Sequence, residues 1–77
     1  MPPAIEVKFY HAVSGMPMGT SLMYETQALA LREGVLFRLN DHDEYGGLWR
    51  VERVEYNTEE FGSGFMTINE VHIWLRG

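Results

Sequence analysis

The chain has 77 residues, with 11 acidic and 6 basic side chains, a formal net charge of -5 and no cysteine. This length predicts one small domain over residues 1–77, in which residues 1–4 are expected to be disordered. The acidic balance disfavours direct nucleic-acid binding, and the lack of cysteine excludes disulfides and cysteine-ligated zinc. No export signal or membrane-spanning stretch is recognisable, which predicts a cytoplasmic protein with no membrane contact.

The first element is expected over residues 5–13. Apolar side chains at Ile5, Val7, Phe9 and Val13 alternate with more polar ones, which predicts a half-buried strand. Residues 14–19 then hold two glycines and a proline, which indicates a loop.

Residues 20–33 have two interpretations. Good helix formers in residues 25–33, with Gly34 as a left-handed residue after the helix, would give a helix. The apolar residues, however, wrap most of the way round such a helix, and no capping box precedes it. We therefore favour a strand followed by an extended crossing.

Residues 35–39 alternate again, with Val35, Phe37 and Leu39 on one face, and the polar residues 40–47 indicate a hairpin tip. The alternation of apolar residues changes phase within residues 48–56, because Trp49 and Val51 occupy odd positions whereas Val54 and Tyr56 occupy even ones. One extra residue predicts a β-bulge near residues 52–53, which keeps the apolar side on the core.

Residues 57–64 are expected to form a flexible acidic loop, and residues 65–75 the last strand. Alternation places Val71, Ile73 and Leu75 on the core face, so that His72 and Trp74 point away from it. The predicted fold is therefore all-β or mostly β, a small barrel of about five strands. The alternative is an α+β fold with one helix at about residues 20–33.

The segment from residue 29 to residue 56 resembles a known pattern. A glycine at Gly34, the strand that follows it, a hairpin tip and the run from Trp49 to Tyr56 resemble the SH3-like small β-barrel proteins of short bacterial and phage reading frames. Val35 departs from the pattern, in which an acidic residue often follows the glycine. The resemblance implies an SH3-like barrel and an accessory protein of a phage or mobile element, such as an assembly component or an inhibitor of a host system.

One stretch partly matches the calcium loop of an EF-hand. Asp41, Asp43, Gly46 and Glu52 occupy ligand or turn positions of that loop, but Tyr45 stands where an oxygen ligand is needed. The flanks alternate like strands, which favours an ordinary hairpin tip. A weak calcium-binding or small-ligand-binding domain centred on residues 41–52 stays as one alternative, and no cofactor is predicted.

Neither the histidines nor the serines suggest catalysis. The three histidines, His11, His42 and His72, are too far apart in sequence to preorganise a metal site, and His11 is expected at the rim of the core. No serine lies in a nucleophile elbow, and no glycine cluster matches a phosphate-binding loop. We therefore expect no enzymatic activity.

The large apolar side chains exceed what a small core needs, since the chain has two Trp, four Tyr, four Phe and five Met. Aromatic residues and methionine often anchor protein interfaces. The leading hypothesis is a non-enzymatic interaction module that binds a protein partner or itself. Its candidate surface residues by parity are Trp74, His72, Tyr10, Phe61, Tyr45, Met23, Met16 and Met18.

A second alternative is an acidic surface that mimics nucleic acid and inhibits a host nucleic-acid-binding enzyme. Its candidate residues are Asp41, Asp43, Glu44, Glu52, Glu55, Glu59 and Glu60. Binding of this kind would weaken steeply with salt, whereas binding through an apolar patch would not.

Overall fold

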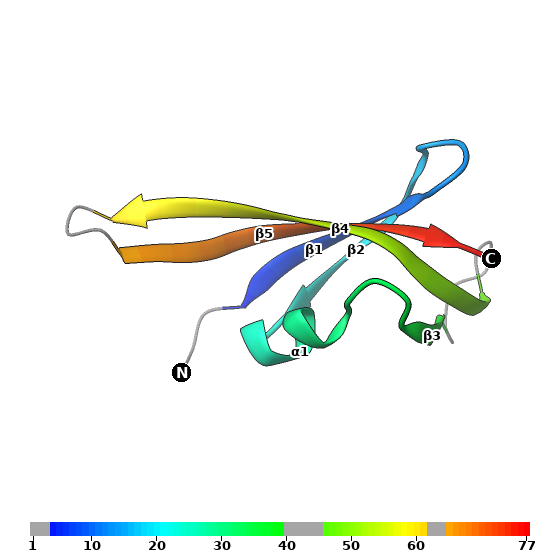
Figure 1. Ribbon diagram of the computed structural model, residues 1–77, viewed down its shortest axis with the longest axis horizontal. Coiled ribbons are helices and arrows are strands. Elements are labelled where there is room, and N and C mark those ends of the chain that lie inside the picture. The colour runs from blue at the N-terminus through cyan, green and yellow to red at the C-terminus, as the bar shows by residue number, and fades with distance from the viewer. Residues whose placement is uncertain (1–3, 40–45, 62–64) are drawn as a thin grey trace.

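The computed structural model describes residues 4–39, 46–61 and 65–77, without the side chains of residues 60–66. Its elements are β1 (Ile5–His11), β2 (Pro17–Met23), α1 (Glu25–Ala30), β3 (Leu36–Leu39), β4 (Gly47–Phe61) and β5 (Phe65–Arg76). The strands form one sheet in the order β2-β1-β5-β4-β3 (Figure 1). The predicted mostly β architecture of five strands is confirmed. Among the described residues, no helix is long and apolar enough to cross a membrane.

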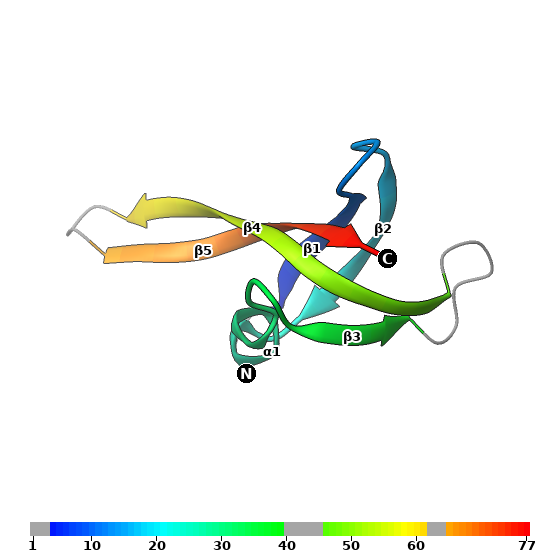
Figure 2. The ribbon, with the colours of Figure 1, turned by 45° about the vertical axis from the view of Figure 1, so that its right-hand side comes forward.

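The last strand, β5, lies at the centre of the sheet. It pairs parallel with β1 and antiparallel with β4, and β2 and β3 form the two edges. The sheet curls into a half-barrel (Figure 2). The ring centroids of Phe9 on β1 and Phe37 on β3 lie 5.6 Å apart across its interior. The two edges do not pair with each other, and α1 connects them.

The core lies on the concave face of this sheet. As predicted from alternation, Val71, Ile73 and Leu75 of β5 are fully buried, and Val7 of β1 is buried beside them. Among the residues whose side chains are described, the buried ones are Ile5, Val7, Phe9, Met18, Ala28, Val51, Val71, Ile73 and Leu75. Since each strand presents alternate residues to this face, the residues between them form the opposite, outer face.

The predicted bulge in β4 is confirmed. Val51 pairs with Leu75 and Arg53 pairs with Trp74, so Glu52 is the extra residue. The bulge changes the parity of the strand, because Val51 is buried and Val54, three residues later, also packs against the core.

The extended crossing predicted after the second strand is wrong. β2 ends at Met23, and residues 25–30 form α1, whose Ala28 is buried. The helix begins where the backbone N–H of Tyr24 donates to Gln27 Oε1 at 3.1 Å, one half of a capping box. Gly34 does adopt a positive φ of 89°, but in the turn before β3, where its N–H donates to the Val51 carbonyl at 2.8 Å.

The boundaries of the first two strands also differ from the prediction. β1 ends at His11, so Val13 lies in the following turn and is 71% exposed. β2 already begins at Pro17, inside the predicted loop. The register shifts by one residue here, because Phe9 pairs with Gly19 and Tyr10 with Pro17. This shift turns Met18 into the core, so its predicted surface position is wrong.

Residues 57–61 belong to β4 rather than to the predicted acidic loop. β3 pairs with β4 only from Gly47 to Arg50, and β1 pairs with β5 only from Glu70 to Leu75. Beyond these pairs the β4–β5 hairpin extends from the body as a two-stranded ribbon (Figure 1). We call residues 55–59 and 67–70, which form the base of this ribbon and its described continuation, the hairpin arm.

Candidate functional site

Three rings and a guanidinium group gather on the outer face of the sheet. Tyr10 of β1 pairs with Trp74 of β5, and His72 lies two residues earlier on β5 and therefore on the same face. Arg53 of β4 pairs with Trp74 from the other side. We call Tyr10, Arg53, His72 and Trp74 the aromatic cluster.

The members of the aromatic cluster are stacked. The Tyr10 ring centroid lies 5.1 Å from that of Trp74 and 5.5 Å from that of His72, with interplanar angles of 23° and 14°. The guanidinium carbon of Arg53 lies 3.9 Å from the Trp74 ring centroid, a cation–π contact. All four side chains thus hold one another in place without contributing to the buried core.

A polar chain continues from the aromatic cluster along β5. The Tyr10 hydroxyl and His72 Nδ1 lie 2.7 Å apart, and His72 Nε2 lies 2.8 Å from Glu70 Oε1. In the neutral imidazole, Nε2–H donates to Glu70 and Nδ1 accepts from Tyr10. Lys8 Nζ reaches the same Glu70 oxygen at 3.0 Å.

The ion pair at the end of this chain shifts both titrations. The hydrogen bond from Lys8 is the main effect that lowers the pKa of Glu70; burial opposes it as the next largest effect, and the charges of Lys8 and His72 lower the pKa further. The hydrogen bond to Glu70 and its charge raise the pKa of Lys8. Both groups are therefore charged at neutral pH, which fixes the orientation of His72.

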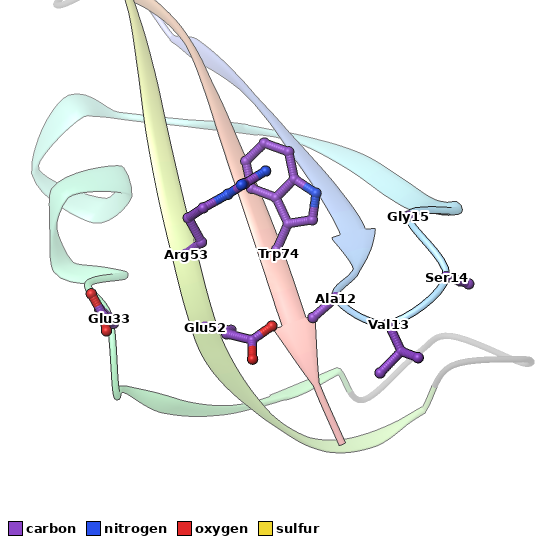
Figure 3. A pocket seen from close by; sticks show the side chains of 8 residues that line it. All are labelled: Ala12, Val13, Ser14, Gly15, Glu33, Glu52, Arg53 and Trp74. Atoms are coloured by element: carbon purple, nitrogen blue, oxygen red, sulfur yellow. The ribbon is translucent and has the colours of Figure 1, made fainter.

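A hollow of about 650 Å³ lies beside Trp74 (Figure 3). The turn at residues 12–15 forms one wall, and Glu33, Glu52, Arg53 and Trp74 complete the lining. Arg53 lies across the indole, and the Glu52 carboxylate projects on the same side of the sheet (Figure 3). Glu52 accepts from Arg76 Nη2 at 2.6 Å and from Nε at 2.9 Å.

The structure brings together three of the predicted surface residues, Tyr10, His72 and Trp74. Met23 is half-buried and packs against the core, so it is not part of the aromatic cluster. Met16 is 58% exposed, as predicted. Tyr45 and the side chain of Phe61 lie outside the described residues.

Sequence reasoning missed Arg53 as a member of the cluster. Its position opposite Trp74 depends on the register between β4 and β5, which the extra residue Glu52 shifts by one. The predicted bulge indicated that a shift occurs, but alternation carries no information on which residue of another strand lies opposite.

The described acidic candidates do not form a continuous unpaired patch. Glu52 is bound by Arg76, Glu55 lies 3.7 Å from Arg53, and Glu59 accepts from the Asn69 amide at 3.5 Å. The others, Asp41, Asp43, Glu44 and the side chain of Glu60, lie outside the described residues.

The calcium-loop match has strands on both sides. Residues 36–39 and residues from Gly47 onward are extended, and Glu52, the last residue of the match, is held by Arg76. Over the described parts of the chain, no three His, Asp or Glu residues are grouped to hold a metal ion. His11 has the expected rim position, where Nδ1 accepts from the Val13 N–H at 3.2 Å and the ring contacts Trp49 edge-on.

Comparison of the chain with protein-family models, curated proteins and solved structures finds no significant match. The interpretation of the site therefore depends on its own geometry. Tyr10, His72 and Glu70 form a hydrogen-bonded chain, but it lies on an open face, with His72 and Glu70 each 25% exposed. An open face of this kind suits binding of a large partner more than the exclusion of water that catalysis usually requires.

Proposed function

We propose that this chain is a non-enzymatic protein-interaction module that contacts a protein partner through the aromatic cluster. The observation that carries the proposal is the composition of this cluster. Trp, Tyr and Arg are the three residue types most enriched among interface hot spots, and here one of each is stacked on the outer face of the central strand.

The rigidity of the cluster supports a binding role. Immobilising a flexible side chain on binding costs about 0.5 to 1.5 kcal/mol, and stacking reduces this cost because the rings are already held. Lys8 and Glu70 provide charges of both signs at one border, and the hollow beside Trp74 can receive a protruding side chain of the partner.

The same geometry speaks against a stacking platform for nucleotides. One face of Trp74 is covered by the Arg53 guanidinium, whereas nucleic-acid platforms leave ring faces free for bases. Glu55 and Glu70 beside the cluster would also repel phosphates.

The experiment is affinity capture from the source organism, followed by measured affinity for the captured protein. Trp74→Ala should weaken binding by about 2 kcal/mol or more, roughly 30-fold. The control is Leu22→Ala, which removes a side chain that is 71% exposed on the edge strand β2. Equal affinities of Trp74→Ala and the unsubstituted protein would refute the proposed contact surface.

A further inference from the structure

One end of the molecule is acidic. The protein is 42 Å long, with the hairpin arm at one end and β3 with the C-terminus at the other (Figure 1). Residues 55–70 hold four of the eleven acidic residues and none of the six basic ones. Glu55, Glu59 and Glu70 are the acidic side chains of the hairpin arm.

The opposite end carries a surface that alternates leucine and arginine. Leu36 pairs with Arg50, and Arg38 pairs with Leu48, so that all four side chains lie on one face. Leu36 and Leu48 are 50% and 51% exposed. Within the described parts of the chain, no carboxylate lies within ion-pair distance of Arg38 or Arg50. We call these four residues the Leu/Arg patch.

Both surfaces also have free backbone edges. β3 is an edge strand, so one side of its backbone has no partner strand in the described structure. Residues 55–59 of β4 pair with β5 on one side only, because β3 begins at Leu36 opposite Arg50 and the segment before it bonds to β4 no further than Val51. Two free strand edges can pair and continue a sheet from one molecule into the next.

We propose that the Leu/Arg patch binds the hairpin arm of a second copy of this chain. In this contact, residues 55–59 of one copy pair with the edge of β3 in the next copy. Glu55 and Glu59 lie on one face of β4, so that one of them can lie beside Arg38 as a cross-strand pair of opposite charge, and Arg50, one strand further in, adds positive charge to the same face.

Three arguments select a second copy in this orientation. A two-stranded ribbon alone is only marginally stable in water, so the hairpin arm gains from a third strand. Two acidic arms repel each other, which disfavours contact between arms. The two surfaces lie farther apart than the screening length of about 8 Å, since even Glu55 and Arg50 are five residues apart on β4 at about 3.3 Å per residue, so the charges of one surface are largely screened from the other within one copy.

The contact joins two different surfaces, so each copy keeps one free arm and one free patch. Such a head-to-tail interface builds open chains, or rings if the rotation closes. It does not use the aromatic cluster and is therefore independent of the function proposed above.

The test is sedimentation velocity over a range of concentrations. The unsubstituted protein should associate at about 50 mM salt and dissociate at about 500 mM. One variant combines Arg38→Glu with Arg50→Glu, and the other combines Glu55→Arg with Glu59→Arg. Each alone should associate at least about tenfold more weakly, and an equimolar mixture of the two should recover association, because each supplies the charge that the other lacks.

Two further variants sharpen the result. The first combines Glu25→Arg with Glu33→Arg, which raises the net charge by the same amount as Glu55→Arg with Glu59→Arg but lies outside both surfaces. It should leave association unchanged. The second combines Asp41→Asn, Asp43→Asn and Glu44→Gln, which removes acidic residues between the two strands of the Leu/Arg patch in the sequence. It should strengthen association, because less negative charge then opposes the acidic arm. Weaker association of this second variant would contradict the proposed electrostatics.

The proposal is overturned if the unsubstituted protein stays monomeric at about 0.5 mM in low salt. It is also overturned if the mixture stays monomeric while circular dichroism shows both variants folded. If Trp74→Ala abolishes association, the contact runs through the aromatic cluster, which would support the proposed function and exclude the arm-to-patch contact.

Discussion

Ile73 and Trp74 are neighbours in sequence on the central strand, and they should respond to truncation in different ways. Ile73 is fully buried, so Ile73→Ala removes core packing and should cost about 2 to 5 kcal/mol. Trp74 loses its stack on Tyr10 and its contact with Arg53. At about 0.5 to 1.5 kcal/mol for an aromatic pair and 0.5 to 1 kcal/mol for an exposed cation–π contact, Trp74→Ala should cost about 1 to 2.5 kcal/mol.

Urea denaturation monitored by circular dichroism measures both costs. The whole domain is stable by about 4 to 11 kcal/mol at its length, so Ile73→Ala uses a large share of the total. A double-mutant cycle of Tyr10→Ala and Trp74→Ala should give a coupling energy of about 0.5 to 1.5 kcal/mol. A larger loss of stability for Trp74→Ala than for Ile73→Ala would refute the assignment of Trp74 to the outer face.

Three other outcomes follow from local geometry. Calcium at about 1 mM should leave the melting temperature unchanged, and an increase that Asp41→Ala removes would contradict the hairpin-tip interpretation. The hydrogen bond between Lys8 and Glu70 lowers the pKa of Glu70 from 4.5 and raises that of Lys8 from 10.5. Its contribution to stability is therefore complete between these two values, and it is lost as the pH falls through the folded pKa of Glu70 or rises through that of Lys8. Lys8→Met should reduce both the acid-side and the alkaline-side loss of melting temperature in melts across pH. Gly34→Ala should lower the free energy of unfolding by about 1 to 2 kcal/mol and Gly34→Asn by less, because a Cβ at this position meets no atom within 4 Å and only the positive φ opposes it. Equal losses for the two variants would contradict this reasoning.

Alternation of apolar residues predicts which face of a strand is buried, because successive side chains point to opposite faces. For this reason the sequence was sufficient to place Val71, Ile73 and Leu75 in the core and Trp74 outside it. It was also sufficient to locate the bulge near Glu52, since a single extra residue reverses the parity of everything after it.

Alternation does not predict which strands are neighbours. Parallel pairing of β1 with β5 joins residues about 64 positions apart, as in the pair Tyr10 and Trp74. No turn motif in the sequence predicts such a long-range pairing. The aromatic cluster therefore could not be assembled from the sequence. Met18 was misplaced for a related reason, because the register shift opposite Phe9 and Tyr10 lies in a stretch whose glycines and proline suggested a loop.

The bulge at Glu52 keeps the apolar side chains of β4 on the core although their spacing in the sequence changes, and the deletion of Glu52 provides the last prediction. Without this residue, ordinary alternation already places Val51 against Leu75, Arg53 on the outer face beside Trp74, and Val54 on the core face. The deletion should therefore leave the fold intact and cost little more than the control Glu52→Ala, which keeps the residue count and removes only the exposed ion pair with Arg76, a contribution of about 0 to 1 kcal/mol. If thermal melts show that the deletion abolishes cooperative unfolding while Glu52→Ala does not, then Glu52 is not the extra residue of β4 and the assignment of the bulge is refuted.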